Sequence, residues 1–144
     1  MFESLPAPGL MGVTITDGVG TIRVYSENAT SIELCLLDQA DPRQANLIID
    51  LVRGENHIWQ VSHPELKPGT KYALRADGPD APRNSFNKSL YLIDPYARGV
   101  VRENAREYHC VVVDGSFDWQ GVAKPNIPMD ELIIYEAHAR GLTR

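Results

Sequence analysis

The sequence has no long apolar run and no cluster of basic residues. With 14 Lys and Arg against 19 Asp and Glu, the 144-residue chain carries a formal net charge of -5. Nucleic acids and anionic membranes are bound through concentrated positive surface, so neither is an expected partner. No apolar stretch approaches the length of a bilayer-spanning helix, and the opening residues MFES lack the basic start of a secretory signal. These absences predict a cytoplasmic protein.

Cysteine is scarce. The only two thiols, Cys35 and Cys110, lie in the strand-like stretches IELCLL and HCVVV. Such positions are typical of buried structural thiols. A disulfide between them is the lesser alternative, because nothing in the sequence indicates an oxidising compartment.

Motifs that would carry chemistry are also missing. The stretch DGVG at residues 17–20 lacks the later glycine and the helix of a phosphate-binding loop, so it predicts a hairpin turn. Asp114 and Asp118 lie beside turn residues, where a carboxylate ordinarily bonds a backbone N–H rather than acting in catalysis. The four histidines are His57, His63, His109 and His138. They have no metal-ligand spacing with each other or with the cysteines, so the sequence predicts no metal, no cofactor and no catalytic residue.

What the sequence does have is a rhythm of short strand-like runs separated by turn residues. This rhythm is typical of an all-β antiparallel sandwich. The alternation in residues 31–37 places Ile32, Leu34 and Leu36 on one face, and residues 71–77 repeat it with Tyr72 inward. No amphipathic helical period interrupts the first eighty residues, which excludes a parallel sheet. The predicted strands are VTIT, TIRVYS, SIELCLL, NLIIDLV, HIWQVS and KYALRAD.

The chain after Pro82 is rich in large apolar residues but broken by prolines, which predicts a meander with additional strands. Pro125 and Pro128 indicate an extended linker of the kind found between domains. We therefore divide the chain into a sandwich domain at residues 1–124 and a linker at 125–144. The apolar run Leu132–Tyr135 at the end of that linker predicts a strand belonging to a following domain.

Aromatic residues are the remaining candidates for function. On a β-sandwich without catalytic groups, aromatic rings can stack on sugars, and Trp59 and Tyr91 are the candidates for such contacts. Trp59 also shares an alternating face with Val61, which favours core packing instead. Tyr96 and Trp119 lie outside the sandwich repeat, so their expected use is an interface with another domain.

Five segments of the sequence resemble, in order, the N-terminal region of bacterial glycogen debranching enzymes and isoamylases. Together they cover nearly the whole chain. DPYAR and IIYEAHARGLT are the most specific. The five segments are SENATSIELCLLD, LKPGTKYALRADGP, FNKSLYLIDPYARGV, CVVVDGSFDW and ELIIYEAHARGLT.

The resemblance implies an immunoglobulin-like (E-set) sandwich classed with the family-48 carbohydrate-binding modules. In that family a (β/α)8 barrel of glycoside hydrolase family 13 follows, and here it would be missing beyond Leu132–Tyr135. The catalytic residues lie on later barrel strands, so the chain itself is expected to be non-catalytic. The implied partner is that barrel, which a parent enzyme would use to hydrolyse α-1,6 branch points of glycogen. The implied barrel contacts are Tyr96, Trp119, Ile133 and Tyr135.

Two alternatives remain open: an independent glycogen-binding module, and an unrelated protein-interaction sandwich. Glycogen-binding cousins carry a tryptophan after each of two strands, and the matching stretches DQADPR and GPDAPR contain none. The resemblance therefore favours packing on the barrel over direct glycan binding. An apolar surface made for a barrel would also make the isolated chain self-associate.

Overall fold

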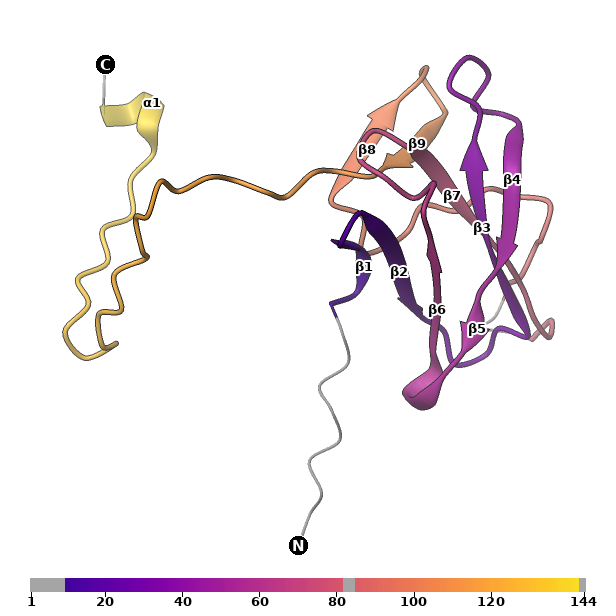
Figure 1. Cartoon of the computed structure of the whole chain (residues 1–144), viewed down its shortest axis with the longest axis horizontal. Coiled ribbons are helices and arrows are strands. Elements are labelled where there is room, and N and C mark those ends of the chain that lie inside the picture. Colours follow the sequence, from indigo (N-terminus) through magenta and orange to yellow (C-terminus); the bar gives the residue numbers. More distant parts are fainter. Residues whose placement is uncertain (1–9, 82–84, 143–144) are drawn as a thin grey trace, which may run out of the picture. The chain divides into compact units, whose positions relative to one another are not determined.

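The computed structural model describes residues 10–81 and 85–142. The chain forms two compact units, Met1–Asp114 and Gly115–Arg144, each described by itself below. Strands make up nearly all the regular secondary structure of the first unit, which has one short 3-10 turn, η1, at Glu55–His57 (Figure 1). Its strands are β1 Gly12–Thr16, β2 Val19–Tyr25, β3 Ser31–Leu37, β4 Ala45–Asp50, β5 Val52–Arg53, β6 Ile58–His63, β7 Lys71–Asp77, β8 Gly99–Arg102 and β9 Tyr108–Val111.

The strands of the first unit form two antiparallel sheets. One has the order β1-β2-β6-β5 and the other the order β4-β3-β7-β9-β8 (Figure 1). Each of the six predicted strand runs overlaps an observed strand. The antiparallel sandwich predicted from the sequence is therefore confirmed.

The inner faces of the two sheets enclose one main core. The alternation predicted from the sequence is confirmed, because Ile32, Leu34 and Leu36 of β3 and Tyr72 of β7 belong to this core. The other face of β3 and β7 carries a small second cluster that contains both Cys35 and Leu37. The remaining buried members of the main core include Ile22, Val24, Leu51, Trp59, Leu66, Leu74, Cys110 and Val112.

The predicted single strand NLIIDLV is in fact two strands that lie in different sheets. β4 pairs with β3 in one sheet, and β5 pairs with β6 in the other sheet. Leu51, between them, is buried, and its backbone N–H donates to the carbonyl of Ile32. The chain crosses from one sheet to the other at this residue because Leu51 fills the core between the layers. A continuous apolar run cannot reveal such a crossing.

The hairpin predicted at DGVG joins β1 to β2. Asp17 and Gly18 both have positive φ, 50° and 79°, as a tight two-residue hairpin turn requires. Gly20 has a different reason to be glycine. A β carbon at this position would lie 1.9 Å from the carbonyl oxygen of Leu66, so the chain around Leu66 packs directly on the Gly20 backbone.

The meander predicted after Pro82 is formed in part. Residues 85–98 have little regular structure, but Leu92 exchanges two backbone hydrogen bonds with Leu74 of β7, at 2.8 and 2.9 Å. β9 pairs with β7 only at Lys71 and Tyr72. Leu92 therefore takes the place of β9 further along the same edge of β7.

The second unit has no strand among its described residues, 115–142. It contains two turns and one short helix, α1, at Ala139–Leu142. Asp118 accepts a hydrogen bond from the backbone N–H of Gln120, which confirms its predicted role in a turn. The first compact unit ends at Asp114, and the domain division expected at residue 124 stays a prediction. Neither helix in the described ranges is long and apolar enough to cross a membrane.

Candidate functional site

A buried carboxylate fixes the segment that follows β7. Asp94, which is 1% exposed, accepts a hydrogen bond from the hydroxyl of Tyr72 at 2.9 Å and another from the N–H of Tyr96 at 2.8 Å. Its own N–H donates to the sulfur of Cys110 at 3.2 Å. Burial raises the pKa of Asp94, against the opposing effect of its two hydrogen bonds. This network holds residues 91–97 against β7 and β9.

A concave surface of about 430 Å³ opens beside this segment, and we call it the arginine pocket. The strands β7 and β9 contribute to it, together with the β3–β4 turn, the β8–β9 turn and residues 89–91. Its volume lies within the usual range for small-molecule sites, about 300–1,000 Å³. It is lined by Arg43, Arg75, Arg106, Glu107, His109, Tyr91 and Tyr108, together with Ser89 and Leu90.

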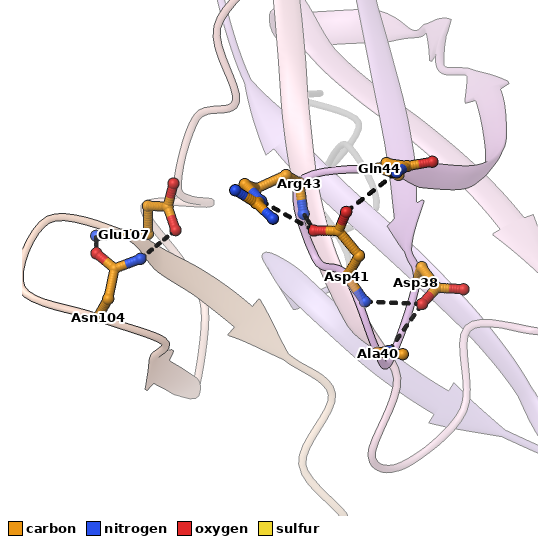
Figure 2. A network of polar contacts seen from close by, with 7 residues as sticks. All are labelled: Asp38, Ala40, Asp41, Arg43, Gln44, Asn104 and Glu107. Atoms are coloured by element: carbon orange, nitrogen blue, oxygen red, sulfur yellow. Dashed lines mark hydrogen bonds and ion pairs between the residues drawn. The ribbon is translucent and has the colours of Figure 1, made fainter.

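The β3–β4 turn on one side of the pocket is ordered by its own carboxylates (Figure 2). Asp41 accepts from the Nε of Arg43 at 2.9 Å and from the side-chain amide of Gln44 at 3.0 Å. Asp38 accepts from the backbone N–H groups of Ala40 and Asp41. The hydrogen bond from Arg43 is the main cause of a lowered pKa at Asp41.

The β8–β9 turn on the other side is ordered by Asn104. The side-chain oxygen of Asn104 accepts from the N–H groups of Arg106 and Glu107, and its side-chain amide donates to the Glu107 carboxylate (Figure 2). The hydrogen bond to Asp41 is the main cause of a raised pKa at Arg43, and the charge of Glu107 across the pocket adds to it. Both rims of the pocket are thus held by side-chain hydrogen bonds within their own turns.

Two polar side chains that line the pocket have buried nitrogens without a hydrogen-bond partner in the described protein. Both ring nitrogens of His109 lack a partner, and His109 is only 4% exposed. The Nε of Arg75 is the third such atom. The Arg75 guanidinium lies over the ring of Tyr91, 4.5 Å from its centroid. The sequence predicted no metal role for His109 and no place in a pocket, although the alternation of β9 puts it on the face opposite the core residue Cys110.

The two predicted carbohydrate contacts have different environments. Trp59 is 5% exposed, its indole N–H donates to the carbonyl of Ser26, and Arg53 lies over its ring. Its ring offers no free face to a sugar, so the core alternative is the one the structure supports. Tyr91 is half-buried and lines the arginine pocket.

The predicted barrel contacts are exposed but do not all belong to one unit. Tyr96 lies in the first unit, whereas Trp119, Ile133 and Tyr135 lie in the second. Ile133 is 94% exposed, and the run Leu132–Tyr135 forms no strand. A strand requires a hydrogen-bonded neighbour, so its assignment to a barrel stays a prediction. Within the second unit an apolar hollow is lined by Trp119, Val122, Ala123, Lys124 and Pro125.

Across residues 10–81 and 85–142, no group of three or more His, Cys, Asp or Glu is arranged to hold a metal ion. Cys35 and Cys110 are free and buried, as predicted, and burial raises the pKa of each to about 11. Thiols with such pKa values remain protonated at neutral pH and are poor nucleophiles.

The first unit is thus an antiparallel sandwich of two sheets with a concave surface that carries tyrosine rings. Residues 10–97 match the family model described as carbohydrate-binding module 48 (isoamylase N-terminal domain). Because this match covers more than half of the chain, the chain belongs to that family.

Comparison with curated proteins gives glycogen debranching enzymes. Those of Yersinia enterocolitica and Serratia proteamaculans are 37% and 36% identical over 89% and 88% of this chain. The chain spans about a fifth of their length, 22% in both cases. Since 89% of 144 residues is 128, the similarity extends beyond the sandwich, which ends at Asp114.

Solved structures with the same fold include pullulanases. The Klebsiella pneumoniae pullulanase complexed with maltotriose aligns with a TM-score of 0.59 at 20% identity, over 73% of this chain and 10% of that one. The Paenibacillus barengoltzii pullulanase, in complex with maltohexaose and α-cyclodextrin, aligns with a TM-score of 0.60 at 17% identity, over 76% and 15%. These similarities establish the fold of the immunoglobulin-like sandwich.

Proposed function

We propose that this chain is the non-catalytic accessory domain of an enzyme that hydrolyses α-1,6 branch points of glycogen. Its role is to pack on the catalytic (β/α)8 barrel and to form one wall of the substrate groove. The active site of such a barrel is built from loops at one end of its strands, so an appended domain can extend the cleft without supplying catalytic groups. The observation that carries the proposal is the similarity to glycogen debranching enzymes, which continues past the sandwich into the second unit.

The exposed apolar residues of the second unit support a packing role. Trp119, Met129, Ile133 and Tyr135 are each at least 66% exposed, and a gathering of exposed apolar residues within one short segment is typical of an interaction site. The rings of Phe117 and Trp119 contact edge to face, 4.7 Å apart, which makes a preformed aromatic pair. Such rings are the usual anchors of a domain interface. Self-association of the isolated chain and a cytoplasmic location stay predictions.

Adding the chain to a debranching enzyme that lacks the matching region should restore activity. The Yersinia enterocolitica enzyme without the region matched by this chain would be produced separately and assayed on glycogen. We expect the rate of branch hydrolysis to rise at least about tenfold on addition of this chain, which alone should hydrolyse nothing, because a positioned cleft wall supplies transition-state binding.

Ile133→Asp is expected to lower that gain by about tenfold or more, since it would bury a charge in the interface. The matched control is Val52→Asp, which changes a residue that is 69% exposed in the first unit and should leave the gain unchanged. Hydrolysis by the chain alone would contradict the non-catalytic assignment. Equal losses in both variants would contradict packing through the second unit.

A second candidate function, independent glycogen binding, is favoured by one observation: Tyr91 lines the arginine pocket. Co-sedimentation with glycogen separates the two functions. We expect the chain to remain in the supernatant, because Trp59 is buried and one face of the Tyr91 ring is covered by Arg75. Pelleting that Tyr91→Ala abolishes and Tyr25→Ala preserves would instead establish glycan binding. Tyr25 is a matched control because it is exposed on β2, away from the pocket.

A further inference from the structure

The arginine pocket contains buried polar atoms that the protein itself does not satisfy. Buried polar groups nearly always have a hydrogen-bond partner, and each one left without costs about 1–3 kcal/mol. Three such atoms, all of them buried, belong to two residues that line a single concavity: both ring nitrogens of His109 and the Nε of Arg75. Their convergence indicates that the pocket receives a polar ligand.

The charges of the pocket indicate the sign of that ligand. Three arginines and one glutamate line it, a formal charge of +2 with the histidine neutral, on a chain whose net charge is -5. The nearby carboxylates already have partners. Arg43 is ion-paired with Asp41, so counting that carboxylate beside the lining lowers the formal charge to +1, and Glu107 accepts from Asn104. The guanidinium of Arg75 is held over Tyr91, so its position is set before any ligand arrives.

We propose that the arginine pocket binds a phosphate monoester carried by a sugar. A guanidinium presents planar paired donors that match phosphate oxygens, and Arg43, Arg75 and Arg106 reach the pocket from three different elements. His109 supplies a further ring nitrogen as donor. The rings of Tyr91 and Tyr108 line the pocket, each with an arginine over one face, and the opposite face of each ring is the apolar surface that would contact the sugar. This inference goes beyond the proposed function, because it concerns a ligand of the first unit and does not depend on a barrel.

The test is a titration of the full chain followed by calorimetry and by the NMR signals of the His109 ring nitrogens. The probes are glucose 6-phosphate, a maltodextrin bearing phosphate monoesters, and neutral maltose. We expect both phosphorylated probes to bind with dissociation constants below about 1 mM and to shift the His109 signals, whereas maltose should do neither. Tighter binding of the maltodextrin would identify a phosphorylated glucan as the source, and tighter binding of glucose 6-phosphate a free sugar phosphate.

Arg106→Gln should weaken binding of the phosphorylated probes by about fivefold or more, because it removes one charge-assisted hydrogen bond. Arg106 is exposed, so this variant should fold normally. The matched control is Arg23→Gln, which removes one charge from β2 in the other sheet and should change affinity less than about twofold.

Three results would overturn the proposal: no binding of either phosphorylated probe at about 10 mM, equally tight binding of maltose, or an equal loss in the two arginine variants. None of them would bear on packing against a barrel. A failure here is therefore distinguishable from a failure of the proposed function.

Discussion

Replacing Gly20 by alanine should lower the free energy of unfolding by about 3 kcal/mol or more, because the new methyl group has no room. The added β carbon would lie 1.9 Å from the carbonyl oxygen of Leu66 and 2.8 Å from its β carbon. Leu66 is itself fully buried in the core. The backbone of β2 or of the Leu66 turn would have to move, and both are held by neighbouring hydrogen bonds. Urea denaturation followed by circular dichroism measures the change.

Gly18→Ala is the control for this substitution. Gly18 lies in the same hairpin with φ of 79°, but no atom lies within 4 Å of an added β carbon. Alanine there should cost only the strain of a left-handed backbone, about 1–2 kcal/mol. A cost at Gly20 no greater than that at Gly18 would show that the close packing of Leu66 on β2 is absent in solution.

Replacing Asp94 by alanine should cost about 3 kcal/mol, since it strands two buried hydrogen-bond donors. The hydroxyl of Tyr72 and the N–H of Tyr96 both donate to this carboxylate. Asp94→Asn should cost less than about 1 kcal/mol, because an amide oxygen can accept from Tyr96 while its NH₂ donates to the Tyr72 oxygen. Denaturant midpoints of the two variants measure the difference. Equal costs for alanine and asparagine would contradict the hydrogen-bonding role.

The stabilities of the native chain and of Asp94→Asn should depend differently on pH. Burial raises the folded-state pKa of Asp94 above its unfolded value. A raised carboxyl pKa favours folding while the group is protonated, and that contribution is lost as the pH rises through the folded pKa. Asp94→Asn lacks this loss, so its stability relative to the native chain should increase from about pH 4 upward. A constant difference across that range would contradict the direction of the shift.

The sandwich could be predicted from the sequence because strand alternation is a local signal. Residues 31–37 and 71–77 alternate cleanly, and both became strands with the predicted faces inward. The split at Leu51 could not be predicted, because a residue filling the space between two sheets has the same apolar character as one inside a strand. The strand expected at Leu132–Tyr135 would need hydrogen bonds to a neighbouring strand, and the sequence of one strand does not show which strand pairs with it.

The candidate site was harder to predict, because it is made of residues distant in the sequence. Arg43, Arg75 and Arg106 come from separate elements, and no spacing links them to His109. The role of Asp94 was hidden for a similar reason. Its partner Tyr72 lies 22 residues earlier, so the residue was visible only as part of the motif DPYAR. The aromatic candidates were the easiest to choose, yet type alone did not distinguish the buried Trp59 from the accessible Tyr91.

The crossing at Leu51 couples the separation of strands in one sheet to the separation of strands in the other sheet. β4 and β5 are consecutive pieces of one chain, joined by a single residue whose side chain is in the core. Peeling β4 away from β3 would pull that residue out and strain the short pairing of β5 with β6. Leu51 thus couples the two sheets mechanically. A force that separates β4 from its sheet also loads the other sheet, so this edge of the domain should resist local unfolding.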